Sequence, residues 1–205
     1  MATQTRYADG DMGGVHPSQS FANWTRVSGN SGYYTYVDDG FVSPTDSAYW
    51  RNRGVTGDVS ATGTWLTLQD GAADLDTLTQ IDFRLRQRIF EVISISDPYD
   101  ANFAISFWDD TGTVFYGSVD IGIADLAYSQ TFVDTGFYSI TGLSLTKAQT
   151  DAMTVYIYGD IYENGNSLRL ELSEIEFVYT YTQISVAASD KHKMDIGLGF
   201  GPGFR

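Results

Sequence analysis

The chain has 205 residues, which is enough to bury one substantial core and lies in the size range where an all-β sandwich remains a single domain. It carries 12 Lys and Arg against 26 Asp and Glu, a net charge of −14, which argues against nucleic acid and anionic membranes as partners. The acidity serves either solubility or docking onto a basic surface. There is no cysteine, which excludes disulfides, a thiolate nucleophile and a cysteine metal site.

Neither end of the chain shows a sustained hydrophobic period. Residues 1–22 are polar and glycine-rich, so we expect an N-terminal arm that is ordered only against something else. Residues 183–205 form a C-terminal tail in which glycines alternate with Phe200 and Phe204, and this tail is either frayed or inserted into a neighbour. The start has neither the basic nor the apolar region of a secretion signal, and no run is long enough to span a membrane, so we expect synthesis in a cytosol.

Between these ends, residues 23–182 read as one β-sandwich domain. Aromatic residues make up 15% of the chain and 21 Gly stand beside 4 Pro, a mixture typical of strands joined by tight turns. Short alternating runs separated by Gly, Asp, Asn and Ser follow one another at the spacing of a β-sandwich or barrel. The first predicted strands lie at 33–37, 47–52 and 64–68.

The clearest alternation lies at residues 80–89. One predicted face is apolar and the other is polar: Ile81, Phe83, Leu85 and Ile89 against Asp82, Arg84, Arg86 and Arg88. The polar face is either solvated or paired across strands, or it meets an acidic neighbouring copy. Arg84, Arg86 and Arg88 are therefore candidate assembly contacts, together with Phe200 and Phe204.

The next segment predicts a hairpin. Phe103, Ile105 and Phe107 alternate, Asp110-Thr111-Gly112 turns the chain, and Val114, Tyr116 and Val119 return. Asp109 and Asp110 are interpreted first as turn residues.

One short helix is predicted near residues 146–153. Thr146 can cap it, with Gln149 three positions later completing a capping box, and Leu145 can act as a hydrophobic staple. Such a helix is too short to be stable alone, so we expect it to be held against one end of the sandwich between two strands.

The last predicted strand changes parity. Leu168, Leu170 and Leu172 occupy even positions, whereas Ile175, Phe177 and Tyr179 occupy odd ones. Keeping both sets in the core requires an extra residue, which predicts a β-bulge near Ser173 and Glu174.

Equipment for catalysis is sparse. The two histidines, His16 and His192, lie outside the expected core, and no nucleophile elbow, zinc-protease or phosphate-loop motif occurs. Neighbouring carboxylates are interpreted first as turn residues, since a glycosidase needs two carboxylates held across a cleft. These pairs are Asp38 with Asp39, Asp74 with Asp76, Asp97 with Asp100, Asp109 with Asp110, and Asp160 with Glu163. The acidic clusters at 97–102 and 159–166 could instead gather oxygen ligands for calcium, although neither has the spacing of a calcium loop.

Aromatic side chains are the other candidate site. The tryptophans and many tyrosines either fill the inner faces of the sandwich or form a sugar-stacking surface. The four tryptophans are Trp24, Trp50, Trp65 and Trp108.

Several stretches resemble a loose group of bacteriophage virion structural proteins. These stretches are "NWTRVSGNSGYYTYVDDGFVSPTDSAYW", "FRLR", "TGLSLTKAQTDAMTVYIY" and "LRLELSEIEFVY", between about residues 23 and 180. The shared features are a tryptophan-led opening, a Y-x-x-V/I-D-D segment and an L-T-x-x-Q-x-D turn. The chain departs from the pattern at "RIFEVISISDPYDAN" and in the tail after residue 183.

The resemblance implies a jelly-roll-like sandwich without catalytic residues. It implies a virion component, made in the host cytoplasm, that decorates or cements the assembled head through the major capsid protein or other virion proteins. Its expected oligomer is a trimer. The alternatives are a tail or fibre module, or a carbohydrate-binding or receptor-binding module that takes a glycan.

Overall fold

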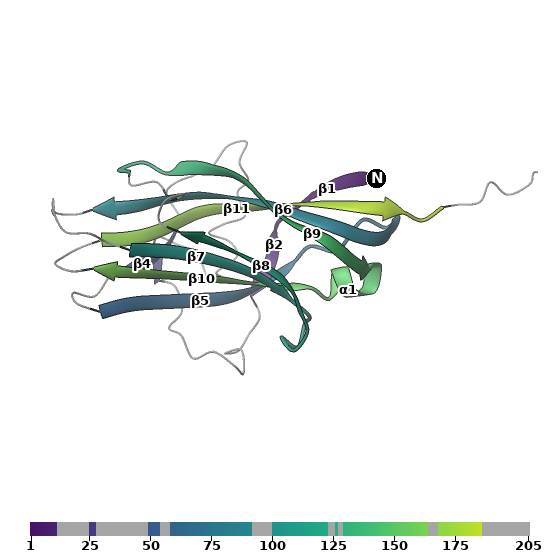
Figure 1. Cartoon of the computed structure of the whole chain (residues 1–205), viewed down its shortest axis with the longest axis horizontal. Coiled ribbons are helices and arrows are strands. Elements are labelled where there is room, and N and C mark those ends of the chain that lie inside the picture. The colour runs from purple at the N-terminus through teal and green to yellow at the C-terminus, as the bar shows by residue number, and fades with distance from the viewer. Residues whose placement is uncertain are drawn as a thin grey trace, which may run out of the picture.

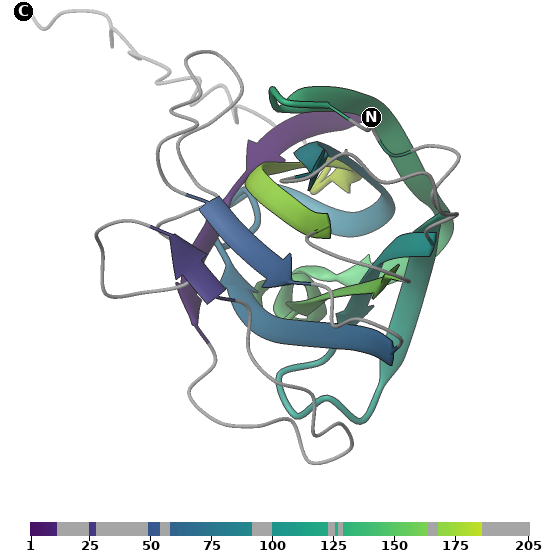
Figure 2. The same ribbon diagram turned by 90° about the vertical axis from the view of Figure 1, so that its left-hand side faces the viewer.

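The computed structural model describes residues 1–11, 25–27, 49–53, 58–91, 100–122, 126, 129–163 and 168–185. Its strands form two antiparallel sheets that pack face to face, as the side view in Figure 1 and the end view in Figure 2 show. The prediction of an all-β sandwich with one short helix is therefore confirmed for this part of the chain. The predicted strand at 33–37 and the candidate contacts Phe200 and Phe204 lie outside the described residues.

One sheet has six strands and the other has five. The six-stranded sheet runs in the order β3 (Thr25–Val27), β4 (Tyr49–Arg53), β11 (Leu168–Gln183), β6 (Leu75–Glu91) and β9 (Val133–Thr146), and β1 (Ala2–Arg6) also pairs with β11. The five-stranded sheet runs in the order β2 (Ala8–Asp11), β5 (Asp58–Leu68), β10 (Thr154–Glu163), β7 (Asp100–Trp108) and β8 (Phe115–Gly122). Within the described residues no helix is long and apolar enough to cross a membrane.

The hydrophobic core lies between the inner faces of the two sheets. Trp50 from β4 is fully buried there, and Asn52 from the same strand donates a hydrogen bond to the carbonyl oxygen of Gly159 on β10 at 2.9 Å, which ties the sheets together. The largest other fully buried apolar side chains of this core are Phe83, Phe103, Phe107, Phe177 and Tyr179.

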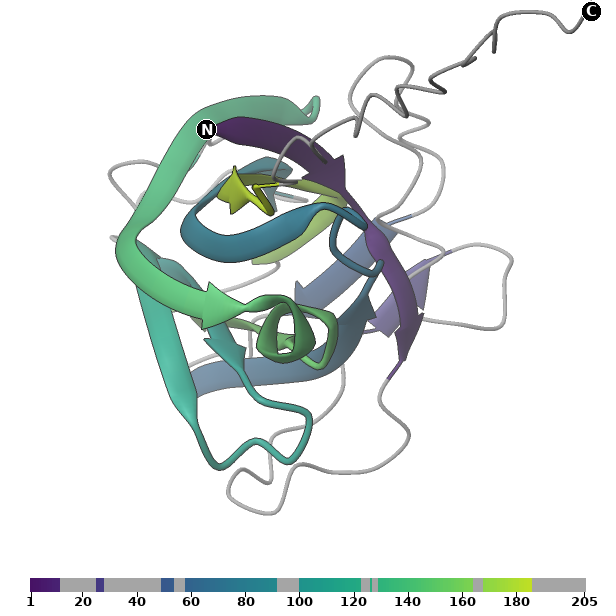
Figure 3. The same cartoon turned by 90° about the vertical axis from the view of Figure 1, so that its right-hand side faces the viewer.

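The first part of the arm expected over residues 1–22 forms two short strands against the sandwich. Ala2–Arg6 pairs with β11 and Ala8–Asp11 pairs with β5, so the N-terminus passes from one sheet to the other along one side of the sandwich (Figure 3). The face of β1 that turns inward consists of Ala2, Gln4 and Arg6, with Arg6 fully buried over the ring of Tyr179. Because two of these three residues are polar, the hydrophobic pattern of the sequence does not reveal the strand.

The predictions for β6 and β11 are confirmed. Ile81, Phe83, Leu85 and Ile89 of β6 are all buried in the core. In β11 the pairing shifts between Leu172, opposite Gln87, and Glu174, opposite Arg86, so that Ser173 is the extra residue of a bulge. Both apolar sets of β11 are consequently buried: Leu170, Leu172, Ile175, Phe177 and Tyr179.

The predicted helix is α1 (Lys147–Asp151), at one end of the sandwich (Figure 3). Thr146 and Gln149 form the predicted capping box, in which the backbone N–H of Gln149 donates to Thr146 Oγ1 and that of Thr146 donates to Gln149 Oε1. Asp151 anchors the helix to the segment between β5 and β6, since it accepts a hydrogen bond from the backbone N–H of Gly71 at 2.7 Å. Within the helix, Lys147 donates to the same carboxylate at 2.6 Å.

The β7–β8 hairpin forms as predicted, with Gly112 in the left-handed region at a φ of 64°. Asp109 organises its turn: the carboxylate accepts hydrogen bonds from the backbone N–H groups of Thr113 and Val114 and from the hydroxyl of Thr111. Burial raises the pKa of Asp109, but these hydrogen bonds outweigh it and lower the pKa from 3.8 to about 2. Asp109 is thus a turn residue, as expected.

Candidate functional site

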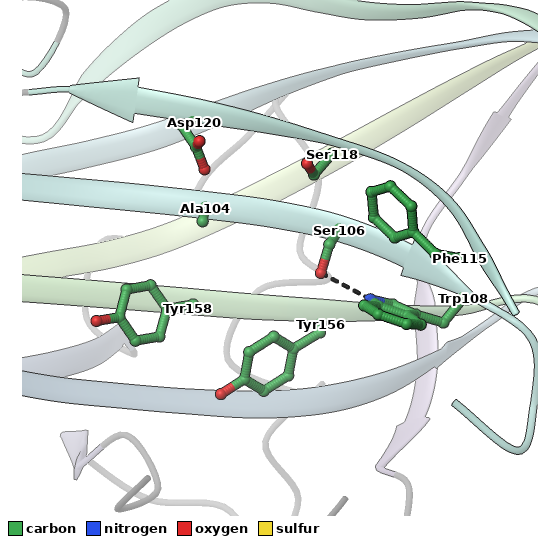
Figure 4. Close-up of a pocket in the computed structure, with 8 residues that line it drawn as sticks. All are labelled: Ala104, Ser106, Trp108, Phe115, Ser118, Asp120, Tyr156 and Tyr158. Carbon is green, nitrogen blue, oxygen red and sulfur yellow. Dashed lines mark hydrogen bonds between the residues drawn. The ribbon is translucent and has the colours of Figure 1, made fainter. Parts of the chain in front are cut away.

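A groove lies on the outer face of the five-stranded sheet, over strands β7, β8 and β10 (Figure 4). Its volume of about 320 Å³ is at the lower end of the roughly 300 to 1,000 Å³ that small-molecule sites occupy. We call it the aromatic groove. Its lining residues are Ala104, Ser106, Trp108, Phe115, Ser118, Asp120, Tyr156 and Tyr158.

The sheet register explains why this surface is hollow. Small side chains stand together in its middle, because Ser106 of β7 is directly opposite Ser118 of β8, and Ala104 lies next to Ser106 on the same face of β7. Larger side chains flank them. Tyr156 and Tyr158 on β10 form one wall, since they pair with Ser106 and Ala104, respectively.

Trp108 and Phe115 close one end of the groove. Their ring centroids are 4.9 Å apart, and the indole Nε1–H of Trp108 donates to Ser106 Oγ at 2.9 Å. That hydrogen bond fixes the orientation of the indole and leaves the hydroxyl hydrogen of Ser106 free for another acceptor.

A β-bulge brings Phe115 to this face. The pairing shifts between Phe107, opposite Gly117, and Trp108, opposite Phe115, so Tyr116 is the extra residue. Without the shift, Phe115 would share the inward face of Gly117 and the following odd-numbered residues. The bulge therefore places a phenylalanine that is 52% exposed beside Trp108.

The wall formed by Tyr156 depends on a glycine in the neighbouring strand. A Cβ atom on Gly63 of β5 would overlap with the ring and hydroxyl of Tyr156. Tyr156 also packs on Trp65, with ring centroids 4.7 Å apart. The ring thus leans over Gly63 and is held there by Trp65.

The tyrosines of the groove remain uncharged at neutral pH. Burial, followed by the nearby Tyr158, raises the pKa of Tyr156 to about 12. Burial, followed by the charge of Asp160, also raises the pKa of Tyr158. Both hydroxyls therefore stay protonated and can donate hydrogen bonds. Asp120 is the carboxylate among the lining residues, and its side chain is exposed.

The candidate assembly residues Arg84, Arg86 and Arg88 lie on the outer face of the other sheet. Arg88 pairs with the fully buried Glu171 at 2.7 Å, and Arg84 pairs with Glu176 at 3.2 Å. Arg84 and Arg88 of the polar face of β6 are thus paired across strands, which is one of the arrangements expected. A role of the three arginines in assembly remains a prediction.

The four tryptophans named as candidates from the sequence occupy different positions in the molecule. Trp108 lies in the aromatic groove, and Trp65 supports it from a position only 6% exposed. Trp50 is a core residue, as the packing interpretation expects, and Trp24 lies outside the described residues.

The candidate calcium clusters are only partly described, since residues 97–99 and 164–167 lie outside the described part. Among the described side chains, no three His, Asp or Glu residues come together as metal ligands.

Most of the groove was not foreseen from the sequence. Phe115, Ser118, Asp120, Tyr156 and Tyr158 were not identified as site residues. A signal was present, because the segment 154–158 alternates aliphatic Val155 and Ile157 with Tyr156 and Tyr158, which puts two aromatic rings on the solvent side. What brings them next to Ser106 and Phe115 is the pairing of three strands, which the sequence of one strand does not contain.

No protein-family description matches the chain, and no curated protein matches its sequence. Among solved structures it is similar to the enzymatically active domain of tailspike protein 4 from bacteriophage CBA120, at 12% identity and a TM-score of 0.37, over 88% of this chain and 19% of that one. It is also similar to TmCBM61, solved in complex with β-1,4-galactotriose, at 6% identity and a TM-score of 0.35, over 67% of this chain and 73% of that one. A third is VP2 of infectious bursal disease virus in its subviral particle, at 7% identity and a TM-score of 0.26, over 89% of this chain and 38% of that one.

The neighbours thus include a phage tailspike domain, a carbohydrate-bound module and a viral capsid protein. The chain spans about a fifth of the tailspike chain and less than half of the capsid protein. Likenesses at these identities and TM-scores say nothing about the ligand or reaction of this chain.

Proposed function

We propose that this protein is a non-enzymatic carbohydrate-binding module of a virion, and that the aromatic groove holds the sugar. The observation that carries the proposal is the groove itself, where rings flank a floor of small hydroxyl-bearing side chains. A pyranose has apolar C–H faces and a rim of hydroxyl groups, so it suits a site that offers both rings and hydrogen-bonding groups.

The polar groups of the groove fit a sugar in kind. Asp120 accepts hydrogen bonds, Tyr158 donates, and Ser106 and Ser118 do either. Binding without cleavage is the better reading, because a glycosidase needs two carboxyl groups across the scissile bond and the described lining contributes one.

The test is glycan-array screening of the full chain, followed by calorimetry with any glycan retained. Phe115→Ala and Trp108→Ala should each weaken binding at least about tenfold, equivalent to about 1.4 kcal/mol. The matched control is Phe137→Ala, because Phe137 is 54% exposed on β9 whereas Phe115 is 52% exposed in the groove. Denaturant unfolding of each variant separates loss of the site from loss of the fold.

If no glycan is retained, or if Phe137→Ala weakens binding as much as Phe115→Ala, the groove is not a carbohydrate site. Hydrolysis of a retained glycan by the pure chain would contradict the non-enzymatic part of the proposal.

Decoration of a capsid is the second candidate. It is supported by the virion-protein resemblance of residues 23–180 and by the exposed apolar side chains of edge strand β9, where Phe137 is 54% and Val133 is 38% exposed. In that role the chain would form a trimer and bind the major capsid protein, with Arg84, Arg86, Arg88, Phe200 and Phe204 as contacts. Light scattering on the pure chain and rebinding to stripped heads test it, and a monomer that fails to rebind would refute it.

A further inference from the structure

The two sheets differ sharply in charge. The strands of the six-stranded sheet carry many arginines, among them Arg6, Arg51, Arg84, Arg86, Arg88 and Arg169. The described strands β2, β5, β7, β8 and β10 of the other sheet contain neither Lys nor Arg, whereas they include Asp9, Asp120 and Asp160. The sheet that bears the aromatic groove is therefore the acidic one.

The described lining of the groove carries no positive charge that could neutralise an anion. Its eight lining residues include the carboxylate of Asp120 and no cationic side chain. Burial, followed by the charge of the nearby Asp160, raises the pKa of the lining residue Tyr158. A second carboxylate, that of Asp160, therefore lies near the wall of the groove that Tyr158 forms.

The negative electrostatic field of these carboxylates opposes the binding of an acidic sugar. Proteins hold carboxylate and sulfate groups with arginine, lysine or several backbone N–H donors. An anion placed in the groove would lose hydration and face Asp120 without such a partner, which is costly for a charged group. An uncharged sugar has no such cost, and its hydroxyls can donate to Asp120.

We propose that the aromatic groove selects uncharged sugar residues and rejects acidic glycans, with Asp120 as the residue that enforces the selection. This inference rests on the proposed carbohydrate-binding function. It narrows the ligands to neutral hexoses and N-acetylhexosamines, and it places sialylated, uronic and sulfated glycans outside the specificity of the site.

The experiment compares matched glycan pairs on the full chain. Lactose and N-acetyllactosamine are measured against their sialylated and sulfated forms, and neutral gluco-, galacto- and manno-oligosaccharides against oligouronates, at about 0.15 M salt. The expected result is binding to one or more neutral members and at least tenfold weaker binding to their acidic counterparts. Raising the salt concentration should narrow that difference, because exposed charges are screened.

Asp120→Asn and Asp120→Lys test the residue. Asp120→Asn should reduce the discrimination severalfold, and Asp120→Lys should reverse it in favour of acidic glycans. The control is Asp110→Asn, which removes an exposed carboxylate from the β7–β8 turn outside the groove lining and should leave the discrimination within twofold.

Two failures are distinguishable. If acidic glycans bind as well as neutral ones and Phe115→Ala still abolishes binding, the groove is a carbohydrate site and the selection rule is wrong. If no glycan binds at all, the proposed carbohydrate-binding function is wrong, and so is the proposed selection of neutral over acidic glycans.

Discussion

Tyr156 occupies the space above Gly63 that any other residue at position 63 would need for its side chain. The two lie on neighbouring strands, two residues out of direct register, since Tyr156 is opposite Trp65 and Gly63 is opposite Tyr158. In this diagonal relationship a long side chain can cover a glycine across the strand. The wall of the aromatic groove is therefore set by a residue that does not line it.

Gly63→Ala tests this relationship. The added methyl group should push the Tyr156 ring away from β5 and destabilise the fold by about 1 to 3 kcal/mol, the usual cost of overpacking. The matched control is Gly122→Ala on β8, where an added Cβ meets nothing within 4 Å and the effect should be small. Urea unfolding of both variants gives the comparison, and equal stability of the two would refute the packing argument.

The capping box of α1 gives a second prediction. Thr146→Ala removes the acceptor of the Gln149 N–H and should cost about 1 kcal/mol of unfolding free energy. Ser144→Ala, an exposed position two residues earlier, is the control and should cost much less. Glycan binding should be unchanged, because α1 contributes no lining residue; weaker binding at unchanged stability would show that the helix does more than close the sandwich.

Glu171 supplies a third prediction. Its fully buried carboxylate joins Arg51 and Arg88, each at 2.7 Å. Glu171→Gln leaves both guanidinium groups without their counter-charge and should destabilise the fold by about 3 kcal/mol.

Asp134→Asn is the comparison for Glu171→Gln. It removes a carboxylate whose side chain is 37% exposed from its pair with Arg84, and it should cost no more than about 1 kcal/mol. Equal costs for the two variants, measured by denaturant unfolding, would show that burial does not decide the strength of these pairs.

Protonation of Asp109 should account for part of the loss of folding stability at low pH. Its folded pKa of about 2 lies below the usual 3.8, so its contribution to stability is fully present above about pH 4. That contribution is lost as the pH falls through the folded pKa. Unfolding measured between pH 5 and 2 should therefore show a smaller acid-induced loss for Asp109→Asn than for the wild-type chain, and carboxyl NMR should find Asp109 still ionised at pH 3. A titration midpoint near 4 would contradict the hydrogen-bonded turn.

Sequence reasoning correctly identified the features that depend only on residues close together within one segment. The alternation of β6, the parity change that requires the bulge at Ser173 and the Thr146 capping box each follow from neighbouring residues. They were predictable because a period of two or a cap at fixed spacing needs no knowledge of the partner strand.

The features that were not predicted depend on partners far away in the chain. β1 holds Gln4 half-buried, and its side chain accepts a hydrogen bond from the backbone N–H of Ala72 at 2.8 Å. Nothing near Gln4 in sequence indicates that partner. The aromatic groove likewise requires Tyr156, Ser106 and Ser118 to be aligned across three strands. The pairing registers of these strands are set when the sheets assemble. Of the features of the groove, only the alternation of tyrosines in β10 could be recognised from the sequence.

The pairing of the first strand with the last has a consequence for how the molecule is made. Ala2 lies opposite Tyr181, so β1 is synthesised nearly 180 residues before the strand with which it pairs. Pairings between such distant segments carry a large loop-closure entropy and form slowly. Folding during synthesis therefore cannot complete the six-stranded sheet, and the side of the sandwich that β1 and β2 cover closes only after translation has passed β11.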